Sequence, residues 1–211
     1  MLKRIGLIGD VHAEADKLEA ALRFFAPQNL DAILCTGDVC DGAGDFNDCC
    51  ALLIENDVQA VRGNHDRWLL ANVARDLSDA TPCCDASEKS LRFLAELPAT
   101  RTFETVAGKL LLCHGVGAND MARVAGDDFG YALEANAELL ELFDSDYELM
   151  IGGHTHRRMV RAFDELLVIN AGTLFRAHEP CCATVDFAKC FVQFHDFEDE
   201  IFVPNCERLE W

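Results

Sequence analysis

Leu7-Ile8-Gly9-Asp10-Val11-His12 closes the short apolar run that starts at Ile5, and it changes abruptly into glycine, carboxylate and imidazole residues. Four later segments repeat this design, an apolar run followed by Gly, His, Asp or Asn: Gly37-Asp38, Gly63-Asn64-His65-Asp66, Cys113-His114-Gly115 and Gly152-Gly153-His154-Thr155-His156. In open α/β sheets, ligands bind beyond the carboxyl ends of the strands. The five segments therefore predict strands that end around one shared site.

Apolar periodicity in the first half of the chain alternates between strand-like and helix-like stretches. Strands are expected at 2–8, 32–35 and 58–61, and helices at 14–25 and 48–55. This β-α-β-α-β order implies parallel strands joined by right-handed crossovers. Residues 68–98 are expected to be mainly helical, with a break at 81–84.

The second half of the chain is richer in strand-like patterns. A hairpin is predicted around Ala107-Gly108, joining 100–106 to 109–113, and a helix is predicted at 133–143. Further short strands are expected at 149–151, 159–163, 166–169, 183–187 and 191–197. The predicted fold class is α/β, with two facing sheets and helices outside them. We expect a single domain over residues 1–211, with room for a small helical cap at 68–98.

Composition limits the location and the partners of the protein. The 211 residues carry a formal net charge of −19, and a field of that sign repels nucleic acid and anionic lipid. The apolar run after Met1 is too short for a signal-peptide core, and no stretch reaches the roughly 18 apolar residues of a membrane span. We expect a cytoplasmic protein without a membrane partner, whose eleven cysteines are buried or semi-buried reduced thiols.

Histidine is concentrated in the five segments. Only His178 and His195, of the seven histidines in the chain, lie elsewhere. Asp10 and His12 are two residues apart, and so are His154 and His156. Residues i and i+2 of an extended chain project to the same side, so each pair can face a common point. Each segment alone is compatible with an ordinary turn, and it is their combination that indicates metal binding.

Together the segments resemble the pattern of the calcineurin-like metallophosphoesterase superfamily, which runs Asp-x-His, Gly-Asp, Gly-Asn-His-Asp/Glu, His and Gly-His-x-His. The match extends in that order from Asp10 to His156. The resemblance implies the family fold, a double β-sheet sandwich flanked by helices in four αββα layers. The β-rich remainder of the chain would complete the second sheet.

The resemblance also implies a binuclear metal centre. One metal would be held by Asp10, His12, Asp38 and His156, and the other by Asp38, Asn64, His114 and His154. Oxygen and imidazole ligands suit Mn, Fe, Zn, Ni or Co, and Mn²⁺ is the ion that we expect first. The implied reaction is hydrolysis of a phosphate ester by a hydroxide that bridges the two metals.

Further positions take roles from the same pattern. His65 matches the family histidine that faces the leaving-group oxygen, and Asp41 matches a carboxylate that often orients this histidine. Asp66 is interpreted as structural. Arg67 and Arg157, which adjoin motif residues, are the candidate arginines for substrate binding, although a surface charge is the commoner role of either.

One departure from the family pattern indicates which branch of the superfamily the chain resembles. Asp41-Gly42-Ala43 stands where protein phosphatases and dinucleoside-polyphosphate hydrolases usually have Asp-Arg-Gly, whose arginine grips the substrate phosphate. The chain instead resembles the small prokaryotic phosphodiesterases of the superfamily, and a small-molecule phosphodiester or phosphomonoester is the expected substrate. Residues 77–89 are expected in a cap and 115–130 in a functional loop. A tolerated surface insertion is the alternative for both.

Two other functions stay open. A nuclease would apply the same chemistry to nucleic acid, which the charge of −19 and the lack of a basic stripe disfavour. An inactive scaffold of the same fold would lack the catalytic histidine, whereas His65 and all seven ligand positions are present. A homo-oligomer is compatible with the sequence.

Overall fold

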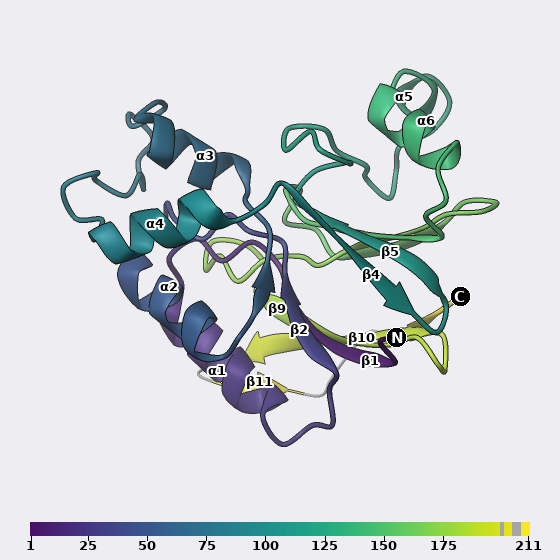
Figure 1. Cartoon of the computed structure of the whole chain (residues 1–211), viewed down its shortest axis with the longest axis horizontal. Helices are drawn as coiled ribbons and strands as arrows, with labels where there is room; N and C mark the ends of the chain where they lie inside the picture. Colours follow the sequence, from purple (N-terminus) through teal and green to yellow (C-terminus); the bar gives the residue numbers. More distant parts are fainter. Residues whose placement is uncertain (199–200, 204–207) are drawn as a thin grey trace.

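Two β-sheets lie face to face, with helices on their outer sides, in a computed structural model of the chain (Figure 1). The structure describes residues 1–198, 201–203 and 208–211. Within these residues the first sheet has the order β11 (Ile201–Val203), β10 (Phe191–Glu198), β9 (Cys181–Asp186), β1 (Arg4–Ile8), β2 (Ala32–Cys35) and β3 (Gln59–Ala60), and β12 (Arg208–Glu210) pairs with β10. The second sheet has the order β4 (Thr100–Thr105), β5 (Gly108–Cys113), β6 (Leu149–Gly152), β8 (Leu167–Asn170) and β7 (Met159–Ala162).

Strand direction brings the carboxyl ends of several strands together. In the first sheet β1 is parallel to β2, and β2 is parallel to β3, as the alternating pattern predicted. In the second sheet β5, β6 and β8 are parallel, while β4 and β5 form the predicted antiparallel hairpin. Loops that follow β1, β2, β3, β5 and β6 therefore carry the five motif segments.

Side chains that point alternately to the two faces of the strands pack into three separate hydrophobic cores. In β1, Leu7 packs in the core between the two sheets, whereas its neighbour Ile8 packs in the core under the helices of the first sheet. In β5, Leu112 enters the core between the sheets and Leu111 faces the helices of the second sheet. This period of two is typical of strands with apolar cover on both faces. The predicted four-layer αββα sandwich is confirmed.

Helices cover both sheets. The first sheet is covered by α1 (Ala15–Phe25), α2 (Phe46–Glu55), α3 (Asn64–Ala71) and α4 (Glu88–Glu96), and the second by α5 (Tyr131–Glu134) and α6 (Ala137–Phe143) (Figure 1). Among the described residues, no helix has the length and apolar character needed to cross a membrane.

Two helix predictions were wrong in detail. The single helix expected at 133–143 is split into α5 and α6, because the Asn136 side chain accepts a hydrogen bond from the Leu139 N–H at 3.1 Å and starts a new helix. The stretch 68–98 holds only the end of α3 and the whole of α4, and 72–87 forms turns. Leu94 of α4 is fully buried in the same core as Leu53 of α2.

The cysteines are free thiols at the ten positions that the structure describes, as predicted, and Cys206 lies outside the described residues. Seven of the ten are buried and Cys190 is half-buried. The adjacent pair Cys83 and Cys84 is exposed, contrary to the expectation of buried or semi-buried thiols, because 72–87 runs over the surface as turns.

Candidate metal centre and catalytic site

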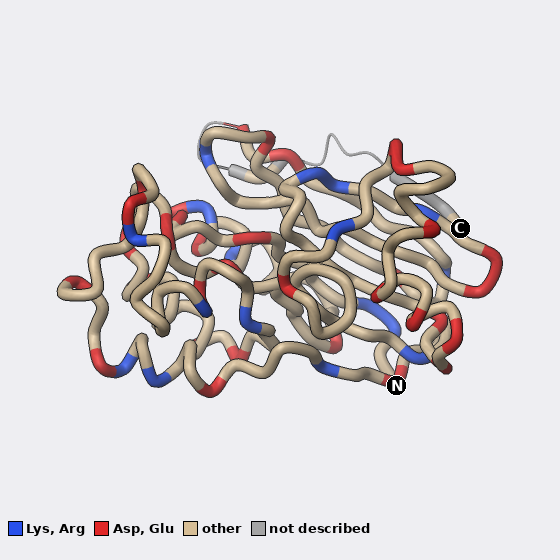
Figure 2. Tube along the Cα trace, turned by 90° about the horizontal axis from the view of Figure 1, so that it is seen from above, with Lys and Arg blue, Asp and Glu red and all other residues tan. Residues whose placement is uncertain are grey.

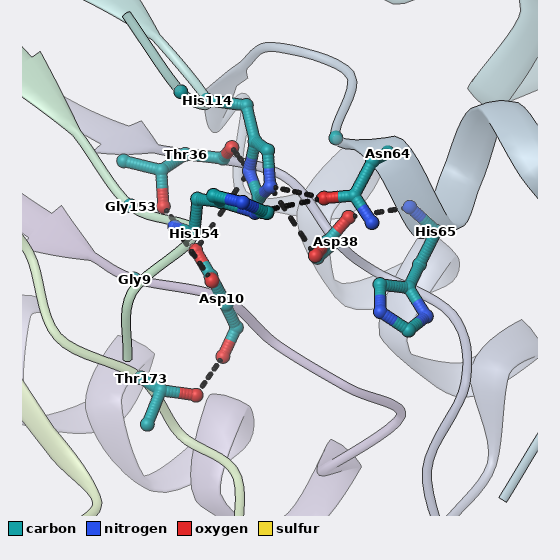
Figure 3. Close-up of polar contacts among 12 residues, drawn as sticks. Gly9, Asp10, Thr36, Asp38, Asn64, His65, His114, Gly153, His154 and Thr173 are labelled. Carbon is teal, nitrogen blue, oxygen red and sulfur yellow. Dashed lines mark hydrogen bonds and ion pairs between the residues drawn. The ribbon is translucent and has the colours of Figure 1, made fainter. Parts of the chain in front are cut away.

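The seven predicted ligands come together from loops that follow five strands. Asp10, Asp38 and Asn64 follow β1, β2 and β3 of the first sheet, while His114 and His154 follow β5 and β6 of the second. The side chains of Asn64, His114 and His154 converge with those of Asp10 and Asp38 (Figure 3). The site therefore lies where the carboxyl ends of the two sheets meet, as the motif segments predicted.

Four of the ligands form a tight group, here called the four-ligand cluster: Asp10, His12, Asp38 and His156. Each offers one ligand atom, and these four atoms lie within 4.8 Å of one another. Nε2 of His156 lies 2.9 Å from Nε2 of His12 and 3.2 Å from Oδ2 of Asp10. Carboxylate oxygens and imidazole nitrogens at such distances could hold a metal ion.

The other three ligands gather on the far side of Asp38. Oδ1 of Asn64 lies 2.9 Å from Nε2 of His114 and 3.0 Å from Nδ1 of His154. Oδ2 of Asp38 lies 3.3 Å from Nε2 of His114 and 3.8 Å from Nε2 of His12. One carboxylate oxygen thus contacts both groups of ligands, which is the position expected of a bridging ligand.

Hydrogen bonds at the other ring nitrogens show that these imidazoles fit a cation. Nδ1 of His114 lies 2.9 Å from the Thr36 carbonyl oxygen, and Nδ1 of His12 lies 2.8 Å from the Asp41 carbonyl oxygen. A carbonyl only accepts, so each Nδ1 carries the hydrogen and each Nε2 presents a lone pair when the ring is neutral. At His114 that lone pair faces oxygens of Asn64 and Asp38, an arrangement that is repulsive unless positive charge lies among them.

The electrostatics of the carboxylates agree with this reading. Burial would raise the pKa of Asp38, but His114, His12 and His65 together outweigh burial and hold that pKa below its ordinary value. Burial would lower the pKa of His114, yet Asp38 and Asp10 raise it to about 10. Burial also holds the pKa of His12 and of His154 below the ordinary value. The site favours a cation at its centre, because buried carboxylates need a nearby positive charge.

The two buried carboxylates are fixed by hydrogen bonds. Asp10 accepts from the Thr36 hydroxyl at 3.0 Å and from the His154 N–H at 2.8 Å. Asp38 accepts from the His65 N–H at 2.8 Å. The backbone of Asp10 is held as well, because Thr173 donates its hydroxyl to the Asp10 carbonyl at 2.8 Å.

Two motif glycines leave room for these carboxylates. A Cβ atom on Gly63 would lie 2.1 Å from Oδ1 of Asp38, and one on Gly153 would lie 2.1 Å from Oδ1 of Asp10. Contacts that short would force the carboxylate or the loop to move. Glycine is therefore required at both positions by the close approach of a ligand side chain.

Left-handed backbone is concentrated at the site. Non-glycine residues uncommonly have positive φ, and such strain clusters at functional sites. Ten non-glycine residues in the described part of the chain have it, and six of these belong to the motif loops: His12, Ala13, Asp38, Asp41, His154 and His156. The loops hold their ligands in conformations that an isolated chain would avoid.

His65 and Asp41 form the predicted pair, with Nδ1 of His65 2.8 Å from Oδ2 of Asp41. Burial would raise the pKa of Asp41, but hydrogen bonds from His65 and Arg75 outweigh burial and lower it to about 2. Burial would lower the pKa of His65, but the hydrogen bond to Asp41 raises it. Arg75 completes a row of three hydrogen-bonded side chains, the Arg75–Asp41–His65 chain. The sequence did not predict the role of Arg75, because this residue lies in a loop that matches no motif.

The remaining predicted residues lie around this centre. Asp66 accepts hydrogen bonds from the backbone N–H groups of Val39, Cys40 and Gly63, and so ties two motif loops together. Arg67 does not point a free guanidinium into the site, since it forms a fork with Asp120 at 2.6 and 2.8 Å.

Arg157 borders a groove of about 760 Å³ that opens beside His156. The groove is also lined by His178, which the sequence placed outside the motifs. Nδ1 of His178 lies 2.7 Å from Nδ1 of His156. No sequence spacing pointed to this contact, which depends on how the chain returns after β8.

Comparison with known proteins gives one family. A model of the calcineurin-like phosphoesterase superfamily domain matches residues 3–189. The uncharacterized protein MJ0912 of Methanocaldococcus jannaschii is 23% identical over an alignment 186 residues long, which covers 81% of this chain and 70% of that protein.

Solved structures agree on the fold. A metallophosphoesterase from Sphaerobacter thermophilus superposes with a TM-score of 0.71 and 22% identity, covering 92% of this chain and 88% of the other. A putative diadenosine tetraphosphatase superposes with a TM-score of 0.65 and 18% identity, covering 93% and 95%.

Proposed function

The chain belongs to the calcineurin-like phosphoesterase superfamily, and from this membership we propose that it hydrolyses phosphate esters at a centre of two divalent metal ions. The four-ligand cluster would hold one ion, and Asp38, Asn64, His114 and His154 would hold the other. The observation that carries the proposal is the position of Asp38, whose Oδ2 lies 3.8 Å from Nε2 of His12 in the four-ligand cluster and 3.3 Å from Nε2 of His114 in the other group of ligands.

Two such ions, when bound, supply a polarised phosphoryl group and a water of lowered pKa. The protein's own residues fix the donors around them and handle the leaving group. Asp41 accepts a hydrogen bond from Nδ1–H of His65, which leaves Nε2 as the ring nitrogen available to a leaving-group oxygen. Oxygen and imidazole donors suit Mn, Fe, Zn, Ni or Co, and among these Mn²⁺ is the ion that we expect first.

A small phosphodiester or phosphomonoester is the proposed substrate. Acidic residues occur over the whole described trace with basic ones scattered among them (Figure 2), so a long polyanion would meet repulsion across the surface. Asp41-Gly42-Ala43 supplies no arginine next to Asp41, which argues against a dinucleoside polyphosphate substrate such as the name of the diadenosine tetraphosphatase neighbour implies. A nuclease and an inactive scaffold are the alternatives.

The test is a screen of the purified protein after chelation and reconstitution with each metal in turn. Substrates are bis(p-nitrophenyl) phosphate, p-nitrophenyl phosphate, cyclic nucleotides and single-stranded DNA, with Asp38→Asn as the control and metal content measured by mass spectrometry. We expect hydrolysis of a small ester, two metals per wild-type chain and fewer in the variant. Two bound metals with no hydrolysis would support the scaffold, and degradation of single-stranded DNA in Mn²⁺ would support the nuclease.

A further inference from the structure

Arg75 grips Asp41 with a two-pronged guanidinium contact. NH1 donates to Oδ1 and NH2 donates to Oδ2, both at 2.8 Å. The Arg75 side chain is 16% exposed and that of Asp41 is 3% exposed, so the pair lies largely out of water. A bidentate arginine–carboxylate contact fixes geometry as well as charge.

The Asp41 carboxylate has every acceptor position filled. Oδ1 accepts from Arg75 and from the Thr81 N–H at 2.9 Å, and Oδ2 accepts from Arg75 and faces Nδ1 of His65 at 2.8 Å. A carboxylate offers about four lone-pair sites. Rotation of this carboxylate would therefore break the contacts of both oxygens together, and Arg75 supplies two of the four.

The backbone of the loop after α3 places Arg75 beside Asp41. Asn72 and Ala74 have φ of 53° and 52°, so the chain turns twice through left-handed backbone within three residues. Nε of Arg75 donates to the Val73 carbonyl at 2.8 Å, which directs the guanidinium. Left-handed backbone disfavours alanine, and such strain persists where the surroundings require it.

We propose that Arg75 is a positioning residue, which fixes the rotation of Asp41 and through it the ring orientation and tautomer of His65. The proposal rests on the function proposed above, in which His65 assists the leaving group. With Arg75 in place, Asp41 can present only Oδ2 to His65, so one ring hydrogen is held on Nδ1. A second ring hydrogen, on Nε2, is then the one that His65 gives to the leaving-group oxygen. Without Arg75, Asp41 can rotate and His65 loses its fixed acceptor.

The kinetic test uses Arg75→Ala and Arg75→Lys on phosphodiesters with a series of leaving groups. We expect Arg75→Ala to lower kcat by about 10–100-fold for alkyl leaving groups, a range typical of partners that orient a functional histidine. The loss is smaller for p-nitrophenol, which departs without help, and KM and metal content stay unchanged. Arg75→Lys recovers only part of the rate, because an ammonium cannot form the fork.

A second readout does not depend on activity. In ¹⁵N-histidine-labelled protein, imidazole correlation spectra report which ring nitrogen carries the hydrogen. Arg75→Ala should alter the His65 signals and leave those of the other histidines in place. Arg101→Ala is the matched control, because Arg101 is also half-buried and holds the Ala60 carbonyl at 2.9 Å without touching Asp41.

The outcomes separate the two proposals. Wild-type kcat on alkyl esters together with unchanged His65 signals in Arg75→Ala would overturn the positioning role. An equal loss for every leaving group, or the same loss in Arg101→Ala, would also overturn it, because either result describes general destabilisation. If the wild type hydrolyses no ester, the proposed function fails, and the imidazole spectra still decide whether Arg75 fixes His65.

Discussion

The four-ligand cluster and the Arg75–Asp41–His65 chain lie side by side, but they differ in whether the protein itself supplies a partner for each polar atom. In the cluster, Nε2 of His12 and Nε2 of His156 lie 2.9 Å apart, beside the carboxylates of Asp10 and Asp38. In the chain, each acceptor oxygen of Asp41 meets a donor from the protein itself. The four-ligand cluster could hold a cation from outside the protein, whereas the Arg75–Asp41–His65 chain is complete from the protein's own residues. We therefore expect metal removal to change the four-ligand cluster more than the Arg75–Asp41–His65 chain.

The largest effect is expected from Asp10→Asn, which weakens the cluster alone. The variant keeps the size of Asp10 but removes one of two carboxylate charges that hold the cation. We expect kcat/KM to fall by about 10³-fold, or about 4 kcal/mol, with a parallel loss of bound metal. Mass spectrometry and steady-state kinetics check it, and full metal content at normal activity would contradict it.

His65→Gln should separate the two regions. The glutamine side chain still reaches Asp41 but offers no imidazole to the leaving group. We expect kcat to fall by about 10²–10⁴-fold while both metals stay bound, since general acid–base groups contribute on that scale. Loss of metal in this variant would show that His65 belongs with the ligands.

Gly63→Ala tests the close packing on Asp38. The new Cβ would lie 2.1 Å from Oδ1 of Asp38, so we expect about 1–3 kcal/mol of lost unfolding free energy and weaker metal binding. Gly126→Ala is the control, because its Cβ would meet nothing nearer than 3.9 Å. Denaturant titration and metal-binding calorimetry measure both, and equal behaviour of the two variants would refute the steric argument.

The effect of Asp41→Asn on the free energy of unfolding should depend on pH. The pKa of Asp41 is lowered to about 2 from 3.8. Between those values the folded protein binds fewer protons than the unfolded chain, so the contribution of Asp41 grows as the pH rises and is lost as it falls. We expect the variant to be less stable by about 2 kcal/mol above pH 4. Urea titrations of the metal-free proteins should show the difference shrinking toward pH 2, and a difference that is constant with pH would count against this account.

Arg67→Ala should have the smallest effect. The guanidinium is already engaged by Asp120 and the side chain is 44% exposed. Surface ion pairs contribute roughly 0–1 kcal/mol, so we expect KM to change by less than about threefold. A large rise in KM, measured beside Arg157→Ala, would restore Arg67 as a substrate contact.

The convergence of the seven predicted ligand positions could be read from the sequence, because each lies within a few residues of a buried strand. Apolar runs located the strand ends, and the topology then brought Asp10 and His114 together although they are far apart in the chain. The start of α6 was readable too, since Asn136 is a favoured N-cap. Arg75 and His178 were not predictable, because their contacts depend on how irregular loops return to the site.

The left-handed residues have a consequence for anyone who wishes to make the protein more heat-resistant. At His12, Asp38, His154 and His156, the left-handed backbone orients a predicted metal ligand, and glycine there would remove that side chain. Asp57 and Cys190 share the same backbone region outside the motif loops. Glycine adopts this conformation without strain, so engineering should begin at those two positions and leave the motif loops unchanged.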